Sequence, residues 1–62
     1  MKIYIGIDLH SNNSYFGVIN ELGERLYDKR IANKPEHILR VMSLISKFGK
    51  IQDVVIESTY KP

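Results

Sequence analysis

Two carboxylates follow apolar stretches near opposite ends of the chain. Asp8 ends the run "KIYIGID", and Glu57 ends the run "VVIE". Aspartate is among the residues that strands disfavour, and a buried carboxylate without a partner is costly. If the two stretches are parallel neighbouring strands, both acids lie at carboxyl ends, where open α/β sheets bind ligands. Adjacent acids repel each other unless one is protonated or a cation lies between them, and carboxylate oxygens suit Mg²⁺ or Mn²⁺.

Each acid also has an ordinary structural interpretation. Asp8 could accept hydrogen bonds from the backbone amides of Ser11 or Asn12 and so cap a turn. Glu57 could be a solvated residue beside the cap-forming Ser58 and Thr59. Residue types and spacing leave both interpretations open.

The polar run "HSNNS" after the first stretch consists of turn-forming residues. His10 could contact a phosphate or a water molecule near a cation, or be a solvated turn histidine. Hydroxyl and amide side chains can also fix the register of a protein on a nucleic-acid backbone. The residues of this kind in the run are Ser11, Asn12, Asn13 and Ser14. Turn formation alone would explain them equally well.

Basic and aromatic residues elsewhere suggest the same kind of partner. Lys34 could belong to a patch that follows a nucleic-acid backbone, although exposed strands and helices normally carry such residues. Three tyrosines could stack on bases, although strand tyrosines mostly pack against their neighbours. They are Tyr15, Tyr27 and Tyr60.

Three strands are predicted in the first half of the chain. Residues 3–7 alternate, with isoleucines on one face and Tyr4, Gly6 and Asp8 on the other. Residues 15–20 form a second strand, and Gly23 can supply the positive φ of a hairpin turn. Residues 25–31 form a third, more exposed strand, so these strands should make an antiparallel meander. Gly6 leaves room on the Asp8 face for a close approach.

A helix and a fourth strand follow. In "NKPEHILRVMSLISKFGK", Pro35 suits the first helical turn and Gly49 can take a left-handed C-cap. Apolar residues at spacings of three and four predict a stripe that packs on the sheet, with Leu39 and Leu44 widening it. Residues 51–58 contain a continuous apolar run, as expected for a strand covered on both faces. A right-handed crossover should place this strand parallel to the first.

Composition limits the possible classes. With 62 residues the chain is at most one small domain. It has no cysteine, which excludes disulfides and thiolate metal sites and agrees with a cytoplasmic location. No apolar run approaches the ~20 residues that span a bilayer, and no signal peptide is expected. A net charge of +2 permits weak attraction to nucleic acid but also describes an ordinary mixed surface.

The stretches "YIGIDLHSNNSYFGVINELGERL" and "VVIESTY" resemble the N-terminal part of the DEDD transposases. These are RuvC-like recombinases of the bacterial insertion-sequence family numbered one-ten. In that family a "GID" aspartate opens the acidic tetrad, a polar hairpin follows, and an "ES-T" glutamate is the second acid. The resemblance covers residues 3–60. It implies a ribonuclease-H-like fold, β-β-β-α-β, with Asp8 and Glu57 as catalytic metal ligands for Mg²⁺ or Mn²⁺.

The chain also departs from that family. The last two tetrad aspartates and a second domain with a proposed serine nucleophile come much later in those proteins. Asp28 and Asp53 do not stand where the missing acids should. We therefore expect residues 1–62 to be one partial domain that binds an ion weakly and does not cleave DNA alone. By the same resemblance, the partners would be DNA, a guide RNA and further copies of the protein.

Two other function classes fit the same stretches. "IGIDLHSNNSYFGVI" also resembles the first phosphate hairpin of actin-like sugar kinases and chaperone ATPases, although that turn usually contains glycine and "HSNNS" has none. The chain could instead be a non-catalytic oligomerisation module. An apolar fourth strand at a sheet edge invites pairing with another chain, so a dimer through this edge is expected.

Overall fold

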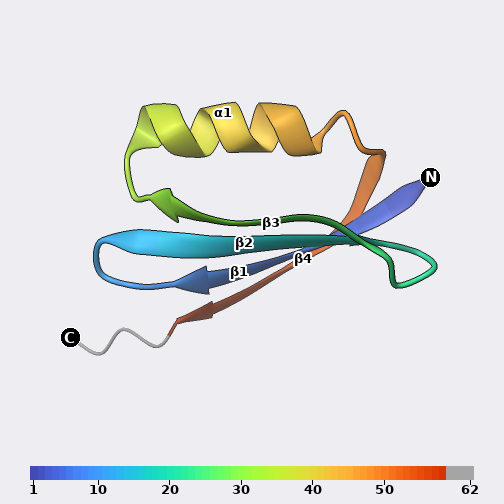
Figure 1. Cartoon of the computed structure of the whole chain (residues 1–62), viewed down its shortest axis with the longest axis horizontal. Helices are drawn as coiled ribbons and strands as arrows, with labels where there is room; N and C mark the ends of the chain where they lie inside the picture. Colours follow the sequence, from blue (N-terminus) through green and yellow to red (C-terminus); the bar gives the residue numbers. More distant parts are fainter. Residues whose placement is uncertain (59–62) are drawn as a thin grey trace.

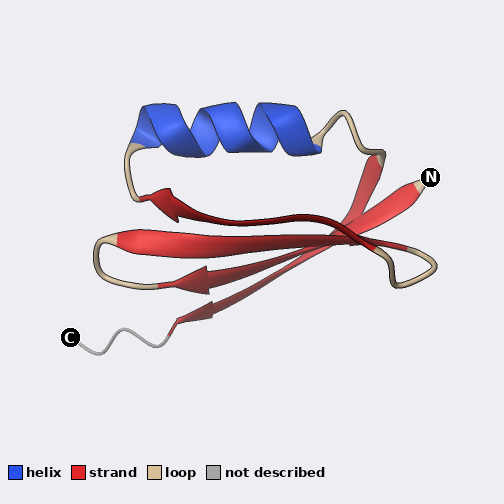
Figure 2. Cartoon of the chain, in the orientation of Figure 1, coloured by secondary structure: helices blue, strands red, loops and turns tan. Residues whose placement is uncertain are grey.

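Residues 1–58 of the chain fold as one mixed β-sheet with a single helix on one face (Figures 1 and 2). The computed structural model describes residues 1–58, so the stacking role considered for Tyr60 lies outside the described residues. The strands are β1 (Lys2–Leu9), β2 (Asn13–Asn20), β3 (Arg25–Ala32) and β4 (Lys50–Ser58), and the helix is α1 (Pro35–Ile45). Within residues 1–58, no helix has the length and apolar character needed to cross a bilayer.

The sheet order is β3-β2-β1-β4. The first three strands form the predicted antiparallel meander, and β4 pairs with β1 in parallel. This confirms an α/β fold in the order β-β-β-α-β, with a fourth strand parallel to the first. The β2–β3 turn depends on Asn20, whose side-chain oxygen accepts hydrogen bonds from the Leu22 and Glu24 amides at 2.9 and 3.0 Å. Gly23 has a φ of 81°, which confirms its predicted role in this turn.

The hydrophobic core lies between α1 and the sheet. Alternation in β1 and β2 directs Ile3, Ile5, Phe16 and Val18 to the helix side, where they are buried. Val41 and Ile45 of α1 are buried against them, and further apolar residues pack around this cluster. The predicted stripe is therefore core. Leu39 and Leu44 are exposed, so the prediction that they widen it was wrong.

The helix ends earlier than the sequence suggests. After Ile45, the amides of Lys47 and Phe48 bond to carbonyls three residues back, at 3.1 and 2.9 Å. After these tight turns, the centroid of the Phe48 ring lies 6.3 Å from the centroid of the Tyr27 ring. Gly49 is not the left-handed helix cap, since its φ is 157°. It passes so close to the Met1 carbonyl that any Cβ there would collide with the oxygen.

β4 is an edge strand with little cover. All nine of its residues are exposed, including Val55 and Ile56. The expectation that β4 is covered on both faces was therefore wrong for residues 1–58. The physical reason is the position of α1, which packs over the β3 side of the sheet and leaves the β4 side open (Figure 1). The expectation that β4 forms an apolar edge is confirmed.

Candidate metal site at the carboxyl ends of β1 and β4

Asp8 and Glu57 are direct register partners in the parallel β1–β4 pair. Partners on adjacent strands point to the same side of a sheet, with Cα atoms about 4.8 Å apart. Here that side is the face opposite α1, and both side chains line one hollow of about 250 Å³. The carboxyl ends of β1 and β4 also lie together in Figure 1. The structure therefore brings together the two acids that the sequence singled out.

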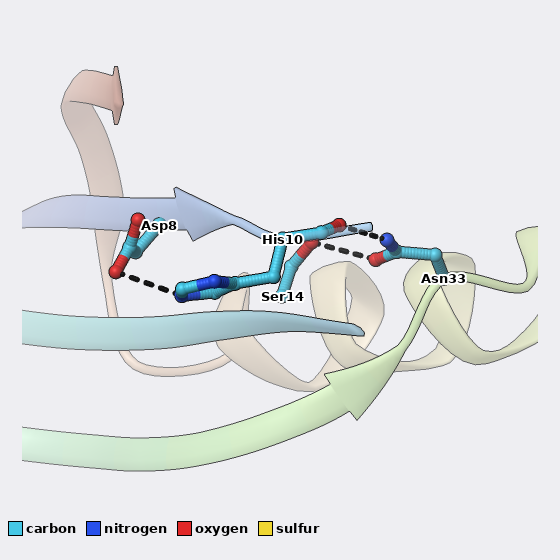
Figure 3. A network of polar contacts seen from close by, with 4 residues as sticks. All are labelled: Asp8, His10, Ser14 and Asn33. Carbon is cyan, nitrogen blue, oxygen red and sulfur yellow. Dashed lines mark hydrogen bonds and ion pairs between the residues drawn. The ribbon is translucent and has the colours of Figure 1, made fainter. Parts of the chain in front are cut away.

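Asp8 has one buried carboxylate oxygen that finds no hydrogen-bond partner among residues 1–58. Its Oδ1 atom makes no hydrogen bond within the described residues. Its Oδ2 atom lies 3.1 Å from Nε2 of His10 (Figure 3). No hydrogen bond joins Asp8 to the amides of Ser11 or Asn12 in residues 1–58, so the turn-capping interpretation of Asp8 was wrong. A buried carboxylate oxygen with nothing to bind has unused capacity for a cation.

His10 lies beside the acids, at the start of the turn. Its side chain is 44% exposed, against 43% for Asp8. His10, for which the sequence left two interpretations open, is therefore in direct contact with the Asp8 carboxylate. Its ring nitrogen can act as donor or acceptor, depending on the tautomer.

The turn is shorter than predicted, because β2 begins at Asn13. Asn13 and Ser14 belong to the strand, since Leu9 pairs with Ser14 across the hairpin. Ser14 is buried, and its hydroxyl donates to Oδ1 of Asn33 at 2.6 Å (Figure 3). The suggestion that Ser14 contacts nucleic acid was therefore wrong. Ser11 and Asn12 remain exposed in the turn.

Asn33 holds the turn in place and was missed from the sequence. Its side-chain amide donates to the His10 carbonyl at 2.7 Å (Figure 3). Its backbone amide donates to the Asn12 carbonyl at 3.1 Å. Together with the bond from Ser14, these contacts tie the β1–β2 turn to the segment before α1. The only sequence signal was a turn-forming residue before "KP", which does not reveal a partner 23 positions away.

Two further residues do not join the acids. Lys34 immediately precedes α1 and lines an apolar groove on the helix side, with Phe16 and Ile38. Lys34 is therefore at the correct end of the sheet but on the opposite face from the hollow. Tyr27 packs toward Phe48 and the core cluster, so its suggested role in stacking on bases was wrong.

The site offers a pair of carboxylates but not a complete coordination shell. In residues 1–58, no three histidine, aspartate or glutamate side chains converge closely enough to hold a metal ion. Mg²⁺ commonly binds one or two protein carboxylates and completes its shell with water and phosphate oxygens. The donor set of Asp8 and Glu57 therefore fits a weakly held Mg²⁺ or Mn²⁺ ion.

Comparison with known proteins adds no relative. No protein-family model, curated protein or solved structure matches the chain. The function of the chain is therefore inferred from its residues and their geometry.

Proposed function

We propose that the chain is the N-terminal part of a ribonuclease-H-like domain of a DNA transposase of the DEDD type. In this proposal, Asp8 and Glu57 supply two of the acids of a divalent-cation site. One observation carries it: the two carboxylates are register partners at parallel strand ends and line the same hollow. Open α/β sheets bind their ligands at such ends.

The chemistry of the pair supports this assignment. Asp8 Oδ1 is buried and without a hydrogen bond among residues 1–58, and Glu57 is its exposed neighbour. A bound Mg²⁺ would supply charge stabilisation for a phosphodiester in transfer. Two carboxylates neutralise the charge of one divalent ion. They do not neutralise the two ions of a two-metal site for phosphoryl transfer. Additional acids and the rest of the catalytic apparatus would have to come from beyond this piece, so it should not cleave DNA alone.

The partners of the chain are proposals on the same basis. DNA is the substrate that a phosphodiester-transfer site implies, and a guide RNA follows from the family resemblance alone. His10, Ser11 and Asn12 are near the acids and remain candidates for contact with a nucleic-acid backbone. Asn13 is half-buried at the start of β2 and is a weaker candidate.

Metal-dependent DNA binding tests this function. Binding of a labelled branched DNA should be at least about tenfold tighter in Mg²⁺ than in EDTA, because the ion joins the carboxylates to a phosphate. Glu57→Gln should remove this difference, since an amide is a poor replacement for a carboxylate ligand. Asp53→Asn is the matched control, because Asp53 is an exposed acid of the same strand.

Two outcomes would contradict the proposal. The first is DNA binding that is equally strong in EDTA and unaffected by Glu57→Gln. The second is an ATP-induced change in the amide resonances of residues 10–14 without any response to DNA, which would favour the actin-like ATPase. Wild-type Mg²⁺ dependence that survives in Asp53→Asn would support the transposase assignment.

We further propose that β4 pairs with β4 of a second copy. Its outer edge has no strand neighbour within the described residues, and Val54, Val55 and Ile56 are exposed along it. Unpaired strand edges of this kind bind other strands. Sedimentation should show a dimer that Val54→Lys disrupts, and a strict monomer at high concentration would contradict this pairing.

A further inference from the structure

A glycine-floored trough crosses the sheet face opposite α1. Gly6 of β1 and Gly17 of β2 are register partners at the centre of the sheet. A Cβ atom added at either residue would meet no atom within 4 Å, so open space lies above both. Paired glycines in two central strands lack side chains for packing and so permit a close approach by another group.

The trough is continuous and has aromatic walls. Two hollows of about 250 and 320 Å³ share Gly6, Gly17, Tyr15 and Val55 in their linings, so they form one depression. Tyr4 and Ile19 extend the wall of the larger hollow. Tyr15 is 37% exposed, which leaves part of its ring available to a ligand.

Charged residues border the trough at one end and along its β3 side. Asp8 and Glu57 line one end. Along the β3 side, Nη1 of Arg25 lies 2.7 Å from Oδ2 of Asp28, the register partner of Gly17, and both residues line the larger hollow. The floor at Gly6 is two residues from Asp8 along β1, which corresponds to about 6.6 Å. A base lying over Gly6 and Gly17 could therefore have its own phosphate next to Asp8 and Glu57.

We propose that this trough receives one unpaired nucleotide of a single-stranded nucleic acid. Its base stacks beside Tyr15 over Gly6 and Gly17, and its phosphate meets the cation held by Asp8 and Glu57. Aromatic side chains on a sheet face are a common platform for bases. This inference rests on the proposed function, because it requires a cation at the acidic end to attract the phosphate.

Charge complementarity favours a nucleotide over an apolar protein segment. Arg25 and Asp28 are bonded to each other, and the remaining guanidinium N–H groups of Arg25 can donate to acceptor atoms of a base. Arg30 is exposed and is the register partner of Tyr15, which places a cationic side chain beside the aromatic wall. An apolar helix in the trough would bury the two acids without partners, which is costly.

Filling the floor tests the proposal without disturbing the fold. Gly17→Ala places a methyl group in open space, and Ala is a tolerated strand residue, so the melting temperature should stay near wild type. The probe is an oligothymidylate of about eight nucleotides in Mg²⁺. Gly17→Ala should weaken its binding roughly tenfold, because stacking of one base contributes on that scale.

Substitutions of Tyr15 give an independent readout. Tyr15→Phe keeps the aromatic ring and should bind the oligonucleotide like wild type. Tyr15→Leu keeps apolar bulk but lacks the ring, and should weaken binding roughly tenfold. Leu39→Ala on the exposed side of α1 is a control that should change nothing. Mg²⁺ titration of each variant should match wild type, because none of these substitutions changes a carboxylate.

The possible results separate this inference from the proposed function. Oligonucleotide binding that weakens in Gly17→Ala and Tyr15→Leu, with metal binding intact, supports both. If metal binding is normal and neither substitution changes the affinity for the oligonucleotide, the trough does not bind a base. The proposed cation site would be unaffected by that result. Oligonucleotide binding that weakens in Gly17→Ala and Tyr15→Leu, but is the same with and without Mg²⁺ and in Glu57→Gln, would support the base site. The same result would overturn the role of the cation. Equal affinity for thymidine monophosphate, or a dimer that Gly17→Ala dissociates, overturns the assignment to a nucleic-acid strand.

Discussion

Asp8→Asn should make the metal-free protein more stable and abolish its stabilisation by Mn²⁺. In EDTA, the free energy of unfolding should rise by about 1 kcal/mol, which corresponds to roughly 4–8 °C in melting temperature for a domain of this size. Wild type should gain about 2.7 kcal/mol when Mn²⁺ is present at 100 times its dissociation constant. The variant should gain nothing measurable.

Both effects have the same physical origin. Asp8 and Glu57 are register neighbours, and like charges directly opposed across two strands are destabilising. Asp8 Oδ1 is also buried without a hydrogen bond among the described residues. An asparagine amide removes the repulsion and can donate to the Glu57 carboxylate, but it is a poor ligand for a divalent cation. Stability of the empty site and affinity for the ion should therefore change in opposite directions.

Thermal unfolding in EDTA and in Mn²⁺ measures both quantities. Asp53→Asn is the matched control, since it removes one negative charge at an exposed position of β4. Asp53 is the register partner of Tyr4, four residues before Asp8 along β1. Asp53 accepts a hydrogen bond from the Val54 amide at 2.9 Å, so its substitution should be near neutral or slightly destabilising. If Asp8→Asn instead destabilises the apo protein and retains the Mn²⁺ effect, Asp8 is a structural residue and not a metal ligand.

Gly49→Ala should destabilise the protein by about 2–4 kcal/mol. The methyl group would collide with the Met1 carbonyl oxygen and approach Cγ2 of Ile3 to 3.2 Å. The φ of 157° adds strain for a residue with a Cβ. The same carbonyl accepts the Lys50 amide at 2.9 Å, which is the contact that begins the β1–β4 pairing. A domain of this size has roughly 3–9 kcal/mol of total stability, so much of it would be lost.

Urea unfolding tests this prediction, with the midpoint expected to fall and the slope to stay constant. Gly17→Ala is the control, because its methyl group enters open space and should change stability by less than about 0.5 kcal/mol. Gly49→Ala should also weaken Mn²⁺ binding although neither acid has changed, since the register of β4 positions Glu57. Equal urea midpoints for Gly49→Ala and wild type would show that the Met1–Gly49 approach does not constrain β4.

The sequence predicted the elements and the meeting of the acids because these depend on local patterns. Alternation in residues 3–7 defined the two faces of β1, and the single helix before residues 51–58 implied a parallel crossover. Once β1 and β4 are parallel neighbours, Asp8 and Glu57 can meet at one edge. That part of the site follows from pattern and connection rules alone.

The remaining features depend on contacts between distant residues. The end of α1 at Ile45 and the conformation of Gly49 are set by the path back to Met1, which no local signal contains. The exposure of β4 reflects where α1 lies across the sheet, and an apolar run does not distinguish a covered strand from an open one. Asn33 bonds to residues of a turn far away in sequence. The pairing of Gly6 with Gly17 required the β1–β2 register.

Paramagnetic broadening by Mn²⁺ in the full 62-residue chain is the most direct test of the cation site. Substoichiometric Mn²⁺ should broaden the amide resonances of Asp8 and Glu57 first, with Tyr15 and His10 next. Lys2 and Lys50, at the other end of β1 and β4, should remain sharp. Uniform or absent broadening at Asp8 and Glu57, or the same pattern in Asp8→Asn, would show that the two strand ends do not hold a divalent cation.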